Sequence, residues 1–208
     1  MPRLQCFTRF TFAQSVGGHK YKMPSIVHDA TTPFKKATFG MGCFWACDAL
    51  FGAQQGVLRT RVGDHTEVIE IDYDPKTISY EDLLATCPSF YITTTTRGES
   101  PKSHLKKEAH KRNEKLVTEI APAGAFYPAE DYHQKYRLQA HSWLCEDLGL
   151  TPELLQSSHV AARLNGYIVG VGKEDDYEKD IAKLGLSDKI ANYVRRHLKE
   201  NAGGNLYC

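Results

Sequence analysis

The stretch ATFGMGCFWACDALFG, residues 37–52, most constrains the fold, because it changes from a strand pattern to a helix pattern within a few residues. Residues 35–40 read as a short strand that ends in glycine, and from Trp45 onward apolar side chains recur at helical spacing. A glycine permits a sharp turn at such a junction. A strand that runs directly into a helix indicates a domain built from packed sheet and helix layers.

The rest of the chain continues this alternation without internal repeats, which predicts an α+β or α/β two-layer domain. Ser79, with Asp82 three residues later, predicts a helix start, and Pro88 ends that helix early. The other predicted elements are a half-buried strand over 65–73, a loop over 89–103, a polar helix over 104–116, a strand over 116–122 and a helix start within 127–139. The aromatic residues of 126–136 are more typical of a core than of a pocket.

Three regions follow from the composition along the chain. Residues 1–33 are expected to be a leader and linker, residues 34–171 the main folded domain, and residues 172–208 a helical extension with a tail that ends in cysteine. The first 28 residues contain arginine and lysine but no aspartate or glutamate, which suits a mitochondrial transit peptide or a disordered tail equally well. We expect a cytoplasmic protein, or a mitochondrial one if the leader targets.

The overall composition excludes several classes of partner. A formal net charge of +1 gives no electrostatic reason to expect nucleic acid or an anionic membrane surface. No apolar run approaches the roughly 18 residues that a membrane span needs. The six cysteines are scattered and include no C-x-x-C pair, which argues against zinc and against a disulfide scaffold. We therefore expect no metal, no bound cofactor and mostly free thiols, as in an intracellular protein.

Cys43 is the candidate nucleophile. It follows Gly42 at the first turn of a predicted helix, where unpaired N–H groups and the positive end of the helix dipole favour the thiolate. Phe44 and Trp45 would add an apolar, partly dry wall that suits a methyl or thioether group. The alternative is that Cys43 is a small buried hydrophobic residue in an apolar run.

Glu67 is the second candidate. In a strand over 65–73 it would share one face with Ile69 and Ile71, so its carboxyl would point to the buried side. Desolvation would then keep it protonated, as a hydrogen-bond donor or general acid beside a thiolate. The alternative is that Glu67 lies at the start of the strand and still reaches solvent.

Three motifs carry a resemblance to a known family. Gly42-Cys43-Phe44-Trp45 resembles the active-site signature of the A-type peptide methionine sulfoxide reductases. GDHTEVIEIDYDPKTISYEDLL, residues 63–84, resembles the family's glutamate-bearing strand and following helix, and VTEIAPAGAFYPAEDYHQKY, residues 117–136, is similar to its late strand and helix. The motifs occur in the family's order and cover much of residues 37–136.

The resemblance implies a ferredoxin-like two-layer fold around a mixed sheet, and a monomeric enzyme that reduces methionine S-sulfoxide in oxidised proteins or as the free amino acid. It implies that Cys43 attacks the sulfoxide sulfur, while Phe44 and Trp45 hold the methyl group. Glu67 would donate to the sulfoxide oxygen. A resolving thiol would then form a disulfide that thioredoxin or another dithiol reduces, with no bound cofactor.

Two parts of the family pattern have no counterpart. Val62-Gly63 run directly into residues 64–67, where relatives have a tyrosine and a glycine-rich segment. Residues 87–104 stand in place of a segment with a histidine-aspartate-proline sequence, an aspartate, a second tyrosine and a strand. We therefore expect a shortened form with an incomplete fold. The alternatives are a catalytically impaired binding protein and a cysteine hydrolase, although no motif places a histidine near the thiol.

The resolving cysteine also departs from the family pattern. Gly166-Tyr167-Ile168 stands where many relatives have a glycine-tyrosine-cysteine triplet. Cys208, behind Gly203-Gly204 in a polar tail, is predicted to be the resolving thiol, and a terminal cysteine without a role is the alternative. Cys47 lies one turn after Cys43 and is expected to pack rather than resolve. The sequence assigns no role to Cys6, Cys87 or Cys145.

Overall fold

The computed structural model describes residues 26–40, 42–64, 67–86, 92–95, 119–122, 124–203 and 206. The strands are β1 (Lys35–Gly40), β2 (Val57–Gly63), β3 (Val68–Tyr73), β4 (Ile92–Thr95) and β5 (Glu119–Pro122). The helices are α1 (Phe44–Gly52), α2 (Tyr80–Thr86), the 3₁₀ turn η1 (Asp131–His133), α4 (Tyr136–Gln139), α5 (Ser142–Asp147), α6 (Pro152–Ser157), α7 (His159–Tyr167), α8 (Glu174–Leu184) and α9 (Asp188–Glu200).

Within those residues the strands form one five-stranded sheet in the order β2-β3-β1-β4-β5. The first four strands are antiparallel to their neighbours, and β5 adds to β4 in parallel. The succession β1-α1-β2-β3-α2-β4 is the β-α-β-β-α-β arrangement of ferredoxin-like folds. The predicted α+β class with a mixed sheet is therefore confirmed.

The two faces of the sheet differ in character. Ile69, Ile71 and Tyr73 of β3 lie in a buried cluster together with residues of α1 and α2. Glu70 and Asp72 alternate with them and lie on the opposite face. The ion pairs there join Lys36 to Glu70 and Asp72, Arg59 to Asp72, and Arg61 to Glu70 and Asp72. One face thus packs against helices, and charged side chains cover the other.

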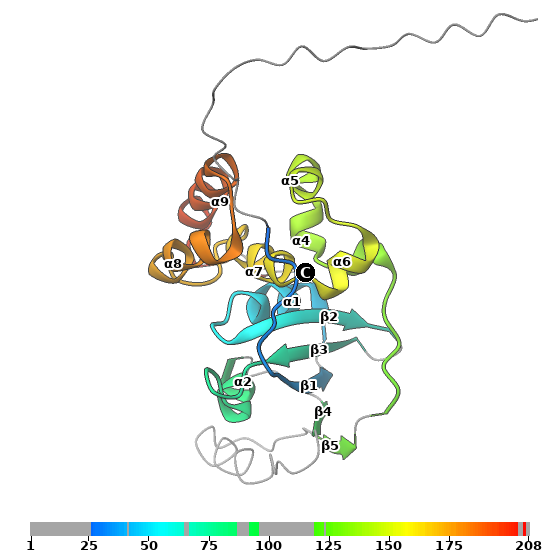
Figure 1. Cartoon of the computed structure of the whole chain (residues 1–208). Coiled ribbons are helices and arrows are strands. Elements are labelled where there is room, and N and C mark those ends of the chain that lie inside the picture. The colour runs from blue at the N-terminus through cyan, green and yellow to red at the C-terminus, as the bar shows by residue number, and fades with distance from the viewer. Residues whose placement is uncertain are drawn as a thin grey trace, which may run out of the picture.

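The helices from α4 to α9 gather on the side of the sheet where β2 lies (Figure 1). Both α6 and α7 pack against β2, which covers an edge strand that would otherwise expose unpaired backbone groups. A second buried cluster, built largely from α7, α8 and α9, lies beyond α1 and includes Leu164, Tyr177 and Val194. The helical unit and the sheet are therefore joined through α1 and α7.

Arg163 links three helices at this junction. Its guanidinium donates to the Gly52 carbonyl at the end of α1 and, through Nε, to the Asp180 carboxylate of α8 at 2.9 Å. The Tyr167 hydroxyl donates to the same carboxylate at 2.7 Å. All three polar side chains lie in the interior, where an unpaired charge would be costly, so the network fixes α1, α7 and α8 relative to one another.

Several sequence-based expectations about elements are confirmed. The α2 start has the predicted reciprocal cap, since the Ser79 amide donates to the Asp82 carboxylate at 3.2 Å and the Asp82 amide donates to the Ser79 hydroxyl at 3.1 Å. The two polar helical stretches expected after residue 172 are α8 and α9. The division of the chain at 171 and 172 stays a prediction.

Other expectations are wrong or incomplete. The segment 89–103 contains β4, which pairs with β1, so it is not wholly a loop. The strand expected from residue 65 begins at Val68. The predicted helix in 127–139 is divided into η1 and α4 by Lys135, whose φ of 51° is left-handed. The helix expected over 104–116 lies outside the described residues.

No helix in the parts of the chain that the structure describes is both long and apolar enough to cross a membrane.

A substitution in α7 tests the close packing of α1 against α7. A Cβ atom on Gly166 would lie 2.4 Å from the Ala49 carbonyl oxygen, and backbone cannot shift cheaply to admit it. We expect Gly166→Ala to lower the free energy of unfolding by about 1–3 kcal/mol in denaturant titrations, because the helices must separate. Gly124→Ala, where a Cβ would meet nothing within 4 Å, is the matched control. Equal stability of the two variants would contradict the close approach.

Candidate functional site

Cys43 lies at the point where β1 leads into α1, as predicted. It is the N-cap residue of α1, half-buried, with φ −43° and ψ 104°. Its sulfur is part of a disulfide, so the structure presents an oxidised state of this thiol. A cysteine at a helix N-terminus lies beside the positive end of the helix dipole, which favours the thiolate once the disulfide is reduced.

The two aromatic residues after Cys43 have different environments. Phe44 is buried in a small cluster with Val62 of β2 and Ala129. Trp45 is only partly buried and packs against that cluster. The ring centroids of Phe44 and Trp45 are 6.4 Å apart. Phe44 therefore anchors the start of α1, while Trp45 presents an aromatic surface beside the thiol.

Residues 132–136 complete the surroundings of Trp45. The indole N–H donates to Nδ1 of His133 at 3.0 Å, and the Tyr136 ring stacks on the indole with centroids 4.1 Å apart and planes 10° apart. Because a tryptophan N–H can only donate, Nδ1 of His133 is the acceptor and its proton is on Nε2, which lies 3.8 Å from a Glu130 carboxylate oxygen. These contacts fix the orientation of the indole.

The expectation that the aromatic residues of 126–136 form a core is wrong. Tyr132 is 60% exposed, Tyr127 57% and Tyr136 40%. They lie at the surface because residues 127–129 follow the edge of β2, with a bridge between Gly63 and Pro128. The segment thus carries its aromatic side chains past Trp45 rather than into the interior.

Gln134 holds this segment against β2. Its side-chain amide donates to the Val62 carbonyl at 2.8 Å and accepts from the Val62 N–H at 2.9 Å. The same amide donates to the Ala129 carbonyl at 3.0 Å. A fully buried glutamine side chain therefore pairs with the edge strand in the way that another strand would.

A buried ion pair joins the same segment to α1. Lys135 is 0% exposed, and its ammonium lies 3.1 Å from the Asp48 carboxylate and donates to the Thr60 carbonyl at 2.5 Å. The Lys135 amide and the Thr60 hydroxyl also donate to Asp48, at 3.0 and 2.5 Å. Burial lowers the pKa of Lys135, and the Asp48 charge opposes this shift. The Asp48 carboxylate therefore has three donors: the Thr60 hydroxyl of β2, and the amide and the ammonium of Lys135.

Glu67 does not occupy the predicted buried face. It is exposed and lies in a turn with φ 38°, before β3 begins at Val68. The alternation that places Ile69 and Ile71 in the core does not extend back to it, so the expected burial is wrong and the solvent-exposed alternative is right. Glu67 nevertheless lies at the site's end of the sheet, because Val68 pairs with Gly40, three residues before Cys43.

The other cysteines fall into two groups. Cys47 is buried in the cluster of the sheet with α1 and α2 and forms no disulfide, so the expectation that it packs is confirmed. Cys145 is a half-buried free thiol whose pKa is raised by burial. Neither is the disulfide partner of Cys43. The three remaining cysteines, Cys6, Cys87 and the predicted resolving residue Cys208, lie outside the described residues.

Metal ligands were not expected, and no group of His, Cys, Asp and Glu able to hold a metal ion occurs among the residues that the structure describes.

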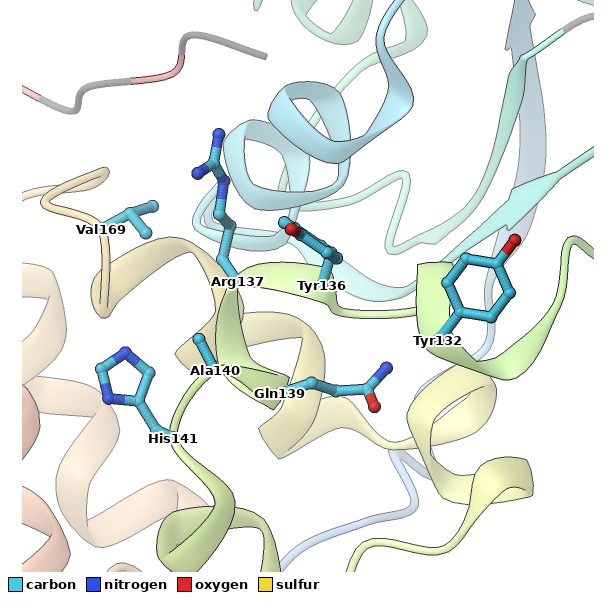
Figure 2. Close-up of a pocket in the computed structure, with 7 residues that line it drawn as sticks. All are labelled: Tyr132, Tyr136, Arg137, Gln139, Ala140, His141 and Val169. Atoms are coloured by element: carbon cyan, nitrogen blue, oxygen red, sulfur yellow. The ribbon is translucent and has the colours of Figure 1, made fainter.

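A cavity of about 570 Å³ adjoins the aromatic residues. Figure 2 shows that it extends from Tyr132 and Tyr136 to His141 and Val169, beside the short helix α4. Arg137, Gln139 and Ala140 supply the rest of the lining. Tyr136 therefore belongs both to the stack on Trp45 and to the wall of this cavity.

Sequence reasoning missed His133, Lys135 and Asp48. Nine histidines are scattered along the chain, and none has a spacing that points to Cys43. The sequence offered one indication: residues 117–136, which include His133 and Lys135, resemble the late strand and helix of the family. Which of these side chains would face Trp45 depends on the left-handed turn at Lys135, which the sequence does not predict.

The chain is similar to known proteins along most of its length. A family model described as peptide methionine sulfoxide reductase matches residues 88–165, and one described as the helical domain of selenoprotein methionine sulfoxide reductase A matches residues 149–198. A peptide methionine sulfoxide reductase of Drosophila melanogaster is 41% identical over 217 aligned residues, which cover 88% of each chain. Peptide methionine sulfoxide reductase A5 of Oryza sativa is 32% identical, over 66% of this chain and 69% of the rice protein.

The 217 aligned positions exceed the 208 residues of this chain, so the Drosophila protein contains residues with no counterpart here. Among solved structures, Mxr1 from Saccharomyces cerevisiae in an unusual oxidized form is 23% identical with a TM-score of 0.38, over 54% of this chain and 85% of that one.

Removing the His133 acceptor tests how Trp45 is held. The chain has two tryptophans, so Trp143→Phe leaves Trp45 as the sole indole fluorophore. In that background we expect His133→Phe to shift the emission to longer wavelength and to increase iodide quenching about twofold, because one hydrogen bond of about 1 kcal/mol is lost. The control is His141→Phe, which removes a histidine hydrogen-bonded to Tyr193 instead. Identical quenching in both variants would show that His133 does not hold the indole.

Proposed function

Because the chain belongs to the peptide methionine sulfoxide reductase family, we propose that it reduces methionine sulfoxide to methionine and that Cys43 is its nucleophile. The single observation that carries the proposal is the position of Cys43 at the N-terminus of α1, directly before Phe44 and the held indole of Trp45. The family works with a thiol reductant, and the substrate class is methionine sulfoxide.

The reaction is a two-electron exchange between two sulfur atoms. The Cys43 thiolate attacks the sulfoxide sulfur, the sulfur–oxygen bond of the substrate breaks, and the oxygen passes to Cys43 as a sulfenic acid. The substrate sulfur is reduced to a thioether. A second thiol then condenses with the sulfenic acid, which releases water and forms a disulfide, and an external dithiol such as thioredoxin reduces that disulfide.

The aromatic side chains suit the methyl group of the substrate. A held indole beside the thiol offers an apolar face to a methyl on sulfur, and Phe44 fixes the backbone from which that indole projects. His133 does not serve as a base for Cys43 in this arrangement, since Nδ1 accepts from Trp45. This contact does not favour the cysteine hydrolase alternative.

Glu67 is the proposed proton donor to the sulfoxide oxygen. The pairing of Val68 with both Gly40 and Gly63 supports this role, because it brings residue 67 to the end of the sheet from which Cys43 projects. The carboxyl is exposed in this structure, so desolvation would come from the bound substrate rather than from the protein interior.

A second thiol of the same chain is the proposed resolving group. The disulfide at Cys43 supports such a pairing, and neither Cys47 nor Cys145 is its partner. This leaves the three cysteines outside the described residues, and of these we propose Cys208. Leu206, two residues before Cys208, packs partly buried against the second cluster, built largely from α7, α8 and α9. This supports contact between the tail and the rest of the protein. We further propose a monomer that uses thioredoxin, in the cytoplasm or, if the leader targets, in mitochondria.

The shortened regions are expected to lower the rate of sulfoxide reduction without changing the type of reaction. The family pattern includes two tyrosine donors and an aspartate that this chain lacks, and the longer aligned length of the Drosophila relative supports a shortened form. Family membership does not favour the binding-only alternative, but fewer donors to the sulfoxide oxygen predict slower chemistry than in complete relatives.

Replacing the nucleophile tests the reaction directly. We expect Cys43→Ser to abolish sulfoxide-dependent oxidation of dithiothreitol, by at least about 10³-fold, because a serine hydroxyl is neither ionised nor readily oxidised. The substrate is N-acetylmethionine S-sulfoxide amide, and product is counted by chromatography. Cys145→Ser, which changes a half-buried thiol on α5, is the matched control and should retain activity. Appreciable turnover by Cys43→Ser would exclude the mechanism.

The resolving step has its own test. We expect Cys208→Ser to leave one stoichiometric reduction per chain intact and to slow thioredoxin-supported turnover by about tenfold or more, because the sulfenic acid then lacks its intramolecular partner. Peptide mass spectrometry after one equivalent of sulfoxide should show Cys43 joined to Cys208 in the native chain. A link from Cys43 to Cys6 or Cys87 instead would assign the role to that cysteine and overturn this part of the proposal.

A further inference from the structure

We propose that His141, together with Tyr193 and His197, forms a pH-sensitive contact that holds the start of α5 against α9 at neutral pH and opens in mild acid. We call these three residues the His141 contact. The inference goes beyond the proposed function and does not depend on it, because none of the three residues belongs to the proposed sulfoxide site. The arrangement of three rings from two parts of the chain carries it.

The three rings form one half-buried cluster. His141 is the N-cap residue of α5, and its Nδ1 lies 2.8 Å from the Tyr193 hydroxyl of α9. The ring centroids of His141 and His197 are 5.0 Å apart with the planes at 76°, and those of Tyr193 and His197 are 4.5 Å apart. Tyr193 and His197 are four residues apart on α9, so both project from the same face of that helix.

Side chains hold the outer edge of α5 against α9. Trp143 meets the Tyr193 ring edge-on, with centroids 4.7 Å apart. Lys189 of α9 lies 4.4 Å from the Trp143 ring centroid and 2.6 Å from the Asp147 carboxylate of α5. Leu144, on the inner side of α5, belongs to the buried cluster of α7, α8 and α9. Opening of the His141 contact would therefore separate the outer edge of this interface and leave its apolar core in place.

Protonation of His141 works against the contact. Burial and the charge of His197 lower the pKa of His141 from its ordinary value. The Tyr193 hydroxyl can accept from an imidazolium as well as donate to a neutral ring, so the hydrogen bond itself does not oppose the proton. Because the closed contact lowers the pKa, protons bind more tightly when the contact is open. Linkage then requires the contact to be strongest above the ordinary histidine range and to weaken as the pH falls through it.

Other charges at this edge do not reverse the effect. The charged groups there include Arg137, Glu146 and Asp147 on the side of α4 and α5, and Lys189, Arg196 and Glu200 on α9. The Arg196 guanidinium lies 5.4 Å from the Tyr193 ring centroid, and Glu200 lies 4.0 Å from Arg196. Asp147 is bound by Lys189. The two carboxylates with a measured partner thus already compensate lysine and arginine rather than an imidazolium.

Quenching of Trp143 fluorescence tests the proposal. Trp45→Phe leaves Trp143 as the sole indole, and acrylamide is an uncharged quencher. We expect the quenching constant to rise about twofold from pH 7.5 to pH 5.5, because opening exposes the indole edge that Tyr193 covers. In this background His141→Asn, which offers the Tyr193 hydroxyl an amide that does not titrate, and His197→Gln, which removes the second imidazole, should each flatten the rise.

The matched control is His28→Asn. His28 is also half-buried, and its Nδ1 lies 2.9 Å from a hydroxyl, that of Ser158, instead of contacting α9. This variant should keep the full rise in quenching. No rise in the Trp45→Phe chain, or the same rise with His141→Asn and His197→Gln as with His28→Asn, overturns the proposal. A rise that coincides with loss of the cooperative melting transition at pH 5.5 is global unfolding and overturns it too.

Hydrogen exchange on the native full chain keeps the test decisive should a variant fail to fold. After correction for the intrinsic pH dependence of exchange, we expect α5 to lose about fivefold of its protection between pH 7.5 and pH 5.5 while β3 keeps its own. Equal changes in both elements, or no change in α5, reject the contact as a pH-sensitive device. Neither measurement uses a sulfoxide, so failure of the proposed function would leave these results unaffected.

Discussion

The buried ion pair between Asp48 and Lys135 is the interaction on which the arrangement of the site depends. Asp48 lies on α1, five residues after Cys43, and Lys135 lies between the two aromatic contacts of Trp45. Both side chains are almost completely buried, and Thr60 of β2 contacts both. Breaking such a pair on one side leaves an uncompensated buried charge, which typically costs about 3–5 kcal/mol. The pair therefore fixes α1, β2 and residues 134–136 as one unit.

The geometry around Trp45 follows from the backbone at Lys135. A left-handed φ of 51° interrupts what would otherwise be one helix from residue 131 to 139. The interruption lets His133 accept from the indole N–H while Tyr136 stacks on the indole ring. A lysine in this conformation is strained by comparison with glycine, and its three buried hydrogen-bonding contacts stabilise it there. The strained backbone at Lys135 thus allows His133 and Tyr136 to orient the Trp45 indole.

Sequence reasoning succeeded where local chemistry decides structure. The turn at Gly42, the reciprocal cap of Ser79 and Asp82, and the polar helices α8 and α9 all follow from residue type and spacing. It did not anticipate β2, because the arginines of that strand face the charged side of the sheet and obscure its apolar alternation. It could not place Lys135 in the interior either, since a lysine is buried only when a distant partner such as Asp48 compensates its charge.

The position of Glu67 shows how the length of one connection governs the chemistry available at the site. Gly63 pairs with Val68, so the four residues 64–67 must reverse the chain between β2 and β3. Relatives that match the family pattern have a tyrosine and a glycine-rich segment in this place. A turn this short leaves Glu67 with a left-handed φ of 38° and an exposed carboxyl, outside the alternation that buries Ile69. The thiol and the aromatic wall, by contrast, are held by α1, β2 and residues 126–136, which do not depend on that connection. The short hairpin therefore leaves the residues that we propose as nucleophile and methyl site in place and affects the proposed proton donor, for which the bound substrate would have to supply the desolvation at Glu67.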